Sequence, residues 1–189
     1  IRKCYLKKFL ALNKTKIITD LDIFYNSNKN CQIIFEPGRI LVADAGLLVS
    51  KVVHVKEVDS LSVVIVDAAM NDLARPSLYD AYHKILPVYE PLPCNSFEKT
   101  DVVGPICEST DTFVRSISLP SLSSGDLLAF SMVGAYGSVM SSTYNSRLLV
   151  PEVMVHNGVF SVVRVRPDYD ELFSLEKIPQ WLGEMRNSE

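Results

Sequence analysis

Residues 104–111 read Gly-Pro-Ile-Cys-Glu-Ser-Thr-Asp and place a thiol and a carboxylate side by side behind a Gly-Pro pair. A cysteine thiol can donate a proton, and a carboxylate can accept hydrogen bonds from an ammonium group. A single cysteine after β-branched residues is usually a small buried hydrophobe, but the carboxylate and the turn make burial less natural. Cys107 and Glu108 are therefore candidates for proton transfer and for binding an amine.

Two further segments each carry an arginine in a setting that suits an anion. Arg39 ends the run Glu-Pro-Gly-Arg at 36–39, where Gly38 lets the backbone approach a ligand closely. A planar guanidinium binds phosphate or carboxylate well. Arg75 stands four residues before Tyr79, so the two side chains share one face if this segment is helical. Each segment alone is also typical of an ordinary exposed arginine.

A fourth segment, residues 134–147, sets Tyr136 among glycines in Gly-Ala-Tyr-Gly-Ser-Val-Met-Ser-Ser-Thr-Tyr-Asn-Ser-Arg. A tyrosine on flexible backbone can lie against a flat ligand. The alternative interpretation is a glycine-rich turn in which the tyrosine only packs. We expect Asn145 and Arg147 to be structural.

The elements that would carry these residues are mainly strands. Several runs rich in β-branched residues are separated by Gly, Pro or Asn, a pattern typical of an all-β sandwich or barrel; they are residues 47–55, 62–66, 101–106, 127–133, 149–155 and 159–165. The pattern predicts helices over 3–12, over 73–85 behind the capping residues Asn71 and Asp72, and over 169–175 and 179–185. Residues 31–35 form a short β-prone run that leads into the turn at 36–39, as a barrel strand delivers a side chain at its carboxyl end.

Composition excludes several classes of partner. The 189 residues carry a net charge of −3, which gives no pull toward nucleic acid or an anionic membrane. No apolar run reaches the roughly 18 residues that span a bilayer. The four cysteines form no Cys-x-x-Cys pair and the three histidines are far apart, so we expect no metal site. Reduced thiols in a cytoplasmic protein are the default expectation. The first residue is Ile rather than Met, which fits a fragment or a processed product.

The four motifs, in their order along the chain (36–39, 75–79, 104–111 and 134–147), resemble the carboxy-terminal portion of the diaminopimelate decarboxylases over about residues 31–175. These enzymes belong to the ornithine/diaminopimelate/arginine decarboxylase family, which uses pyridoxal 5′-phosphate (PLP) on an alanine-racemase-like, fold type III scaffold. The resemblance implies a mainly β fold. Residues 1–40 would be a remnant of the PLP-binding α/β (TIM-like) barrel, ending in its last strand. Residues 41–189 would be the carboxy-terminal β-sandwich or barrel domain with an active-site helix at 73–85.

The same resemblance implies a role for each candidate residue. Cys107 would be the catalytic proton donor, and Glu108 would recognise the distal amine of the substrate. The other substrate-binding residues would be Arg39, Arg75, Tyr79 and Tyr136, and the cofactor would contact Glu36, Pro37, Gly38, Arg39 and Tyr136. The loop at 104–111 would reach the active site of a neighbouring subunit, which makes a homodimer the expected assembly.

Substrate choice follows from the distal end of the amino acid. Diaminopimelate ends in an amine plus a carboxylate, so its site needs a cation (Arg39 or Arg75) as well as a carboxylate (Glu108). The expected reaction is decarboxylation of meso-2,6-diaminopimelate to L-lysine and CO2, the last step of lysine biosynthesis. The alternative is a related PLP decarboxylase acting on another diamino acid.

The family's cofactor-holding lysine sits in a Tyr-Ala-x-Lys context, which does not occur in this sequence, and no glycine precedes Gly38 to form the family's phosphate loop. We therefore expect the chain to be inactive without an amino-terminal-half polypeptide. The competing expectations are a split or truncated enzyme, a decayed gene, and a non-catalytic remnant or dimerisation module.

Overall fold

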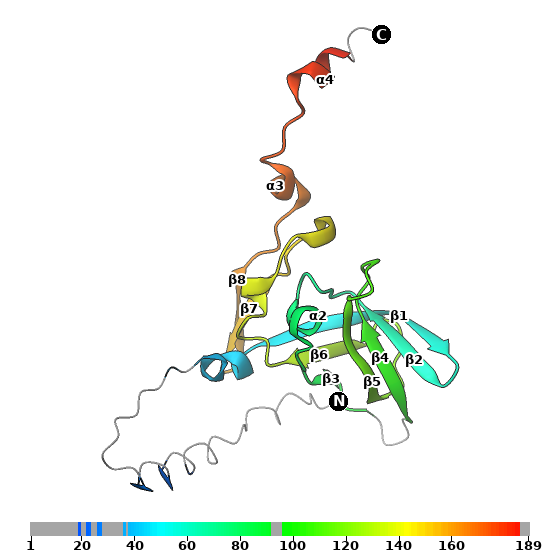
Figure 1. Ribbon diagram of the computed structural model, residues 1–189, viewed down its shortest axis with the longest axis vertical. Helices are drawn as coiled ribbons and strands as arrows, with labels where there is room; N and C mark the ends of the chain where they lie inside the picture. Colours follow the sequence, from blue (N-terminus) through cyan, green and yellow to red (C-terminus); the bar gives the residue numbers. More distant parts are fainter. Residues whose placement is uncertain are drawn as a thin grey trace. The chain divides into compact units, whose positions relative to one another are not determined.

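The computed structural model describes residues 38–91 and 96–185, together with the isolated positions 19, 22, 23, 26, 27 and 36. The chain divides into two compact units that meet between Ser141 and Ser142 (Figure 1). The predicted helix at 3–12 and the predicted strand at 31–35 lie outside the described residues. The domain boundary at residue 40 stays a prediction.

Unit 1, which ends at Ser141, is built on a six-stranded sheet in the order β3-β6-β1-β2-β4-β5. The only parallel pair among these strands is β2 with β4, and the other neighbours run antiparallel. The strands are β1 (Leu47–Val58), β2 (Leu61–Val66), β3 (Ile85–Pro87), β4 (Phe97–Val103), β5 (Thr112–Pro120) and β6 (Leu127–Ser131). The mainly β class expected from the sequence is confirmed.

Strand β1 changes partner halfway along its length. Its first part, from Leu47 to Lys51, pairs with β6, and the part from Val52 to Val58 pairs with β2. The register shifts between Val52 and His54, which marks a bulge or irregularity where the strand can bend. The bend lets one long strand serve two parts of a curved sheet.

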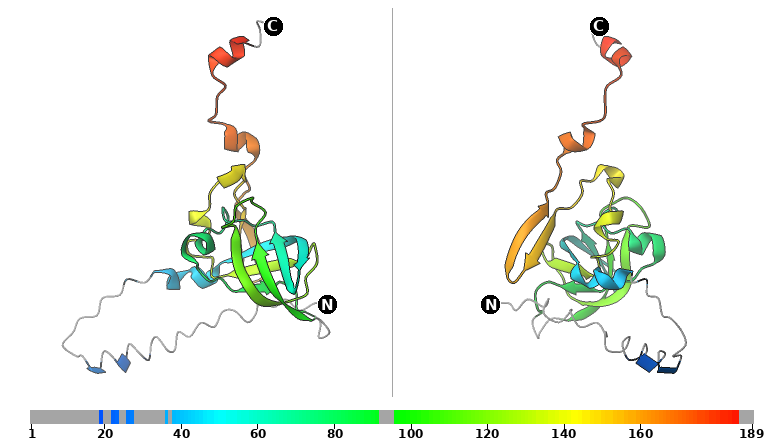
Figure 2. Two further views of the ribbon diagram at one scale, coloured as in Figure 1. Left: turned by 45° about the vertical axis from the view of Figure 1, so that its right-hand side comes forward. Right: turned by 90° about the vertical axis from the view of Figure 1, so that its left-hand side faces the viewer.

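The sheet curls until its two sides meet in a common interior. Phe113 on β5 and Phe130 on β6 contact each other with ring centroids 4.7 Å apart, although three strands separate β5 from β6 in the sheet. Figure 2 shows the strands of unit 1 wrapping around this interior. Burying one such large side chain contributes about 1.5–3 kcal/mol. The enclosed core consists of Val52, Val64, Val66, Ala68, Leu73, Ile85, Val102, Phe113, Leu119, Leu128 and Phe130.

The helix predicted over 73–85 is wrong in length. Only α2 (Arg75–Tyr79) is helical, because Asp80 adopts a left-handed conformation with φ of 50° and ends it. The last residue of the same interval, Ile85, begins strand β3 instead. Proline at the start of α2 is favourable, since its missing N–H is not needed in the first turn.

The capping role predicted for Asn71 and Asp72 is also wrong. The residue that precedes α2 is Ala74, which makes no side-chain cap. The carboxylate of Asp72 instead accepts a hydrogen bond from the Ala69 amide at 2.9 Å, which closes the turn between β2 and α2. A local bond of this kind is the usual alternative to capping for a short polar side chain.

Strand β5 was missing from the predicted pattern. Its centre carries Arg115, Ser116 and Ser118, which are polar and exposed, so the sequence has no long β-branched run there. The predicted strand at 101–106 is displaced, because β4 begins at Phe97 and ends at Val103. The remaining predicted strands of unit 1, at 47–55, 62–66 and 127–133, are confirmed within a few residues.

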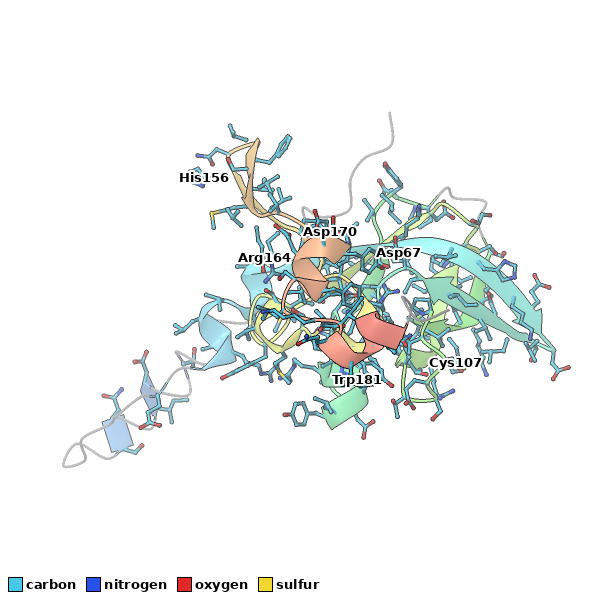
Figure 3. The ribbon with its side chains drawn as sticks, turned by 90° about the horizontal axis from the view of Figure 1, so that it is seen from above. Asp67, Cys107, His156, Arg164, Asp170 and Trp181 are labelled. Carbon is cyan, nitrogen blue, oxygen red and sulfur yellow. The ribbon has the colours of Figure 1, made fainter. Side chains whose placement is uncertain are left out.

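Unit 2 begins at Ser142 and holds one hairpin and short helical turns. Strands β7 (Glu152–His156) and β8 (Val159–Arg164) pair antiparallel around Asn157 and Gly158, whose positive φ values of 48° and 81° suit a tight hairpin turn. Arg164, labelled in Figure 3, pairs with Glu152 at 2.8 Å. The strands predicted at 149–155 and 159–165 correspond to this hairpin.

The end of the described chain contains two short helices, α3 (Tyr169–Phe173) and α4 (Gln180–Met185). A capping box starts α3: the Asp168 carboxylate accepts from the Glu171 amide at 2.7 Å, and the Glu171 carboxylate accepts from the Asp168 amide at 3.2 Å. Both helices lie where the sequence predicted them. None of the helices in the described part of the chain has the length and apolar character that a bilayer crossing requires.

Candidate active site

Strand pairing brings the four chemically distinctive segments to one end of the sheet in unit 1. Leu47 at the start of β1 lies opposite Ser131 at the end of β6, and Ile85 at the start of β3 lies opposite Phe130. The chain before β1, the chain after β6 and the chain before β3 therefore emerge together. These stretches carry Arg39, Tyr136 and the α2 helix.

The connections after β2 and β4 leave the sheet in the same direction, at the level of Val52 to His54 on β1. Val66 at the end of β2 pairs with Val52 on β1, and Val103 at the end of the parallel strand β4 pairs with Ile65. The first connection leads into α2, and the second is the loop at 104–111 that carries Cys107. Segments that are far apart in the sequence thus share one rim of the sheet.

The Arg39 segment and the Tyr136 segment are in direct backbone contact. Two 3-10 turns, η2 (Arg39–Leu41) and η3 (Ala43–Ala45), precede β1. The Gly134 amide donates to the Ala43 carbonyl at 3.0 Å, and the Val133 amide donates to the Gly46 carbonyl at 3.2 Å. A Cβ on Gly134 would overlap the Val42 carbonyl oxygen, and a Cβ on Gly46 would overlap the backbone of Gly134. This close approach explains glycine at both positions.

Tyr136 is held in an unusual backbone conformation. Its φ is 59°, in the left-handed region that non-glycine residues rarely adopt. The next residue, Gly137, is packed so tightly that a Cβ there would overlap the Val133 carbonyl oxygen. The side chain of Tyr136 is 50 % exposed, so part of its ring is free to meet a ligand. The turn η4 (Ser138–Met140) follows directly.

Arg75 and Tyr79 lie on one face of α2, as their spacing predicts. The guanidinium carbon of Arg75 lies 5.8 Å from the centre of the Tyr79 ring, within the range of a cation–π contact. The Nε atom of Arg75 is buried and has no hydrogen-bond partner among the described residues. Tyr79 itself is 64 % exposed, so its hydroxyl remains accessible.

His83, which the sequence gave no reason to single out, lies buried behind these arginines. Its Nδ1 lies 2.8 Å from the Ser131 carbonyl oxygen and must donate to it, which leaves Nε2 as a buried acceptor without a partner among the described residues. Burial lowers the pKa of His83, the bond to Ser131 opposes this, and the charges of Arg75 and Arg39 lower it further. Arg39 and Arg75 therefore both lie close enough to His83 to act on it.

The loop at 104–111 presents Cys107 to solvent and attaches to α2. Cys107 is a free, exposed thiol (Figure 3), and Glu108 is half-buried. The Ser77 hydroxyl of α2 donates to the Thr110 carbonyl at 2.7 Å. Exposure of Cys107 agrees with the expectation that its surroundings disfavour burial.

A second residue missed by sequence reasoning, Asp111, closes the loop at 104–111. It is 3 % exposed, and its carboxylate accepts hydrogen bonds from the Met70 amide at 2.7 Å and the Ile106 amide at 2.8 Å. The only sequence signal was its position at the end of the Gly-Pro-Ile-Cys-Glu-Ser-Thr-Asp motif. A partner 41 residues away, as Met70 is, has no local signature.

The described residues fit a flat, phosphorylated cofactor. A Cβ at Gly38 would meet nothing within 4 Å, so the turn before Arg39 is open to a ligand. Glu36 and Arg39 are exposed and the Tyr136 ring is half-exposed, whereas Pro37 lies outside the described residues. Within the part of the chain that the structure describes, no group of three His, Cys, Asp or Glu side chains could hold a metal ion.

Comparison with known proteins gives consistent matches. Residues 16–134 match the family model described as pyridoxal-dependent decarboxylase, C-terminal sheet domain. The chain is 48 % identical over 153 residues to a diaminopimelate decarboxylase of Zymomonas mobilis, covering 81 % of this chain and 36 % of the relative. It is 47 % identical over 146 residues to a diaminopimelate decarboxylase of Helicobacter pylori, covering 76 % and 35 %.

Solved structures give the same result. Diaminopimelate decarboxylase from Helicobacter pylori complexed with L-lysine superposes with a TM-score of 0.72 at 38 % identity, covering 93 % of this chain and 42 % of that chain. The enzyme from M. jannaschii superposes with a TM-score of 0.74 at 36 % identity, covering 88 % and 38 %.

The chain spans little more than a third of the length of the curated relatives that it matches. The match covers most of unit 1, including α2 and the loop that carries Cys107, and ends at Gly134. The chain therefore belongs to the pyridoxal-dependent decarboxylases, among which it corresponds to the carboxy-terminal sheet domain.

Proposed function

We propose that this chain forms the substrate-binding and proton-donating part of a PLP-dependent diaminopimelate decarboxylase, which converts meso-2,6-diaminopimelate to L-lysine and CO2. The observation that carries the proposal is that strand pairing brings the Arg39, Arg75 and Tyr136 segments to one end of a single sheet, with the Cys107 loop attached to the Arg75 helix by the Ser77–Thr110 hydrogen bond. Relatives named diaminopimelate decarboxylase, at 48 % and 47 % identity, support the choice of substrate.

The residues proposed to hold the cofactor are Glu36, Pro37, Gly38, Arg39 and Tyr136. Pyridoxal phosphate, when bound, supplies an electron sink for the pair of electrons released as the α-carboxylate leaves. The open turn at Gly38 leaves room for a phosphate beside the Arg39 guanidinium. Tyr136 offers a half-exposed ring to the flat face of the ring system.

Substrate recognition in this proposal depends on opposite charges at the distal end. Arg75 with the Tyr79 hydroxyl binds a carboxylate, Arg39 adds a second cation, and Glu108 binds the distal ammonium group. Neither arginine forms an ion pair with another described residue, so both guanidinium groups remain available to anionic groups of the cofactor and the substrate. Burial lowers the pKa of His83 near them, which disfavours a further positive charge there.

Cys107 is proposed to return a proton to the α-carbon after CO2 leaves. A positioned general acid of this kind typically contributes about 10²–10⁴-fold to a rate. Because the thiol is exposed in the single chain, it suits a site completed across a subunit boundary. A homodimer with shared active sites is therefore part of the proposal.

The sequence contains no Tyr-Ala-x-Lys, so the lysine that attaches the cofactor comes, in this proposal, from an amino-terminal-half polypeptide. A cytoplasmic location belongs to the same proposal, because the free thiol of Cys107 suits a reducing compartment.

The decisive test measures PLP absorbance and CO2 release for the chain alone and for the chain mixed with the amino-terminal half of the Zymomonas mobilis relative. We expect cofactor retention and CO2 release from diaminopimelate in the mixture, and neither with the chain alone. Binding to an intact decarboxylase with no gain of activity would identify a non-catalytic dimerisation module instead.

Glu108→Gln and Arg75→Lys test the proposed specificity in the active mixture. Gln removes the charge at Glu108, whereas Lys keeps the charge at Arg75 but loses the planar fork of the guanidinium. A charge-assisted contact is worth about 1.5–3 kcal/mol, so we expect KM for diaminopimelate to rise about tenfold or more. The matched control is Arg115→Lys, an exposed arginine on β5. Equal losses with every diamino acid would favour a related decarboxylase that acts on another substrate.

A further inference from the structure

The Asp111 carboxylate bridges two connections at the functional end of the sheet. One oxygen accepts from the Met70 amide at 2.7 Å, in the connection that leads from β2 to α2. The other accepts from the Ile106 amide at 2.8 Å, in the loop from β4 to β5. Ile106 directly precedes Cys107, so this bond lies one residue from the thiol.

The backbone of Asp111 closes the same loop. Its carbonyl accepts from the Gly104 amide at 2.9 Å, and its amide donates to the Glu108 carbonyl at 3.0 Å. Asp111, at the end of this segment, thus holds both Gly104 at its start and Glu108 in its middle. The Ser77 bond to Thr110 adds a link to α2 at 2.7 Å.

Gly104 leaves the space that this carboxylate occupies. A Cβ on Gly104 would overlap both carboxylate oxygens of Asp111. Asp111 is 3 % exposed, and a buried carboxylate is costly unless its hydrogen bonds are made. The interior therefore offers this carboxylate an aligned pair of backbone donors, a geometry that an amide cannot reproduce because one of its two terminal heavy atoms donates.

We propose that Asp111 is a positioning residue that fixes Cys107 and Glu108 at the rim of the sheet, with Cys107 placed for proton donation. Asp111 touches neither substrate nor cofactor in this scheme. It acts through the loop, by tying the residue before Cys107 to the connection that leads into the Arg75 helix. This inference rests on the proposed function of Cys107.

Asp101 provides a matched control on the neighbouring strand. It is also buried, at 8 % exposed, and its carboxylate accepts from the Ser116 amide at 2.7 Å. Its other oxygen lies 3.6 Å from an Arg115 nitrogen. These two contacts join β4 to β5, and neither of them involves the loop at 104–111. Asp101→Asn therefore removes a comparable buried carboxylate without loosening Cys107.

The first experiment follows the loop itself in the full chain, without any assay of activity. Alkylation of Cys107 and amide hydrogen exchange over 104–111 are measured by peptide mass spectrometry for the wild type, Asp111→Asn and Asp101→Asn. We expect exchange at Ile106 to rise about tenfold or more in Asp111→Asn, with a changed Cys107 alkylation rate, since a charge-assisted bond is worth about 1.5–3 kcal/mol. Asp101→Asn should stay within about twofold at both readouts. Unchanged exchange and alkylation in Asp111→Asn would overturn the proposal.

The second experiment is a double-mutant cycle in the active mixture. Asp111→Asn should lower kcat about tenfold or more in the wild type, but should have little further effect on kcat in a Cys107→Ala background. In an Arg75→Lys background its effect on kcat should remain. A kcat loss of the same size in the Cys107→Ala background would mean that Asp111 only stabilises the fold, and the positioning role would be rejected.

If Asp111→Asn fails to fold, Gly104→Ala serves as a second variant, because its methyl group displaces the Asp111 carboxylate without removing it. The same changes in exchange and in the cycle are expected. An inactive wild-type mixture would count against the proposed function, whereas the exchange and alkylation results would still decide whether Asp111 holds Cys107.

Discussion

At the scale of single residues, His83 is a buried side chain whose titration is clearly perturbed. It is buried at 3 % exposed, its Nδ1 bonds to Ser131, and two cations lie near it. Burial favours the neutral ring, so the pKa falls below the ordinary value of 6.5. The His83 ring is therefore harder to protonate in the folded protein than in the unfolded chain.

This difference predicts a pH dependence of stability. His83 contributes stability that is fully present above pH 6.5 and is lost as the pH falls through the lowered pKa of the folded state. His83→Asn keeps a donor for Ser131 and does not titrate, so we expect its unfolding free energy to fall less on acidification. Urea midpoints from about pH 5 to 8 measure this, over the range in which histidine ordinarily titrates. Parallel pH curves for the two proteins would contradict it.

Residue-level prediction from sequence succeeded where the signal is local. The four-residue spacing of Arg75 and Tyr79 predicted their shared face, and the contact at 5.8 Å confirms it. His83 and Asp111 were missed because their partners are distant: Ser131 lies 48 residues from His83, and Met70 lies 41 residues from Asp111. The catalytic and binding roles of the candidate residues stay predictions.

At the scale of elements, the contact between η3 and the turn after β6 joins the Arg39 and Tyr136 segments. Gly134 allows it, because its amide reaches the Ala43 carbonyl while its Cα lies against Val42. Gly134→Ala would place a methyl group on the Val42 carbonyl oxygen and 2.9 Å from the Gly46 nitrogen. Overpacking of this kind typically costs about 1–3 kcal/mol.

We therefore expect Gly134→Ala to lower the free energy of unfolding by about 2 kcal/mol. Urea unfolding of the full chain measures it. The control is Gly38→Ala, because a Cβ at Gly38 meets nothing within 4 Å. Equal stability of the two variants would show that the backbone segments can move apart at no cost.

The sequence predicted the strands that are rich in β-branched residues. It did not predict where α2 ends, because that depends on the backbone dihedral angle of one residue, Asp80. Strands β1, β2 and β6 follow apolar runs that any pleated, half-buried surface favours. The interval 73–85 has a helical pattern of apolar residues, but the left-handed Asp80 stops α2 after Tyr79. Strand β5 pairs through its backbone while exposing polar side chains, so its existence depends on β4 beside it.

At the scale of the whole chain, the hydrophobic core belongs to unit 1 alone. Every side chain of the core cluster, including the partly buried members, lies between Leu48 and Val133. A chain that ends at Ser141 should therefore keep a cooperative thermal transition and the near-ultraviolet circular dichroism of the packed Phe113–Phe130 pair. A broad transition without that signal would mean that the core depends on residues beyond Ser141.

Because β1 pairs with two different strands, its two halves find their partners at different times while the chain is being synthesised. The half from Val52 to Val58 can close at once as a hairpin with β2, since only Asp59 and Ser60 separate the two strands. The half from Leu47 to Lys51 must wait for β6, whose first pairing residue is Leu127. At roughly 5–20 residues per second, the ribosome needs on the order of several seconds to make the intervening chain. Strand β1, the first strand of the sheet in the sequence, is thus among the last to be fully paired. Its segment from Leu47 to Lys51 stays an exposed edge until synthesis passes Ser131.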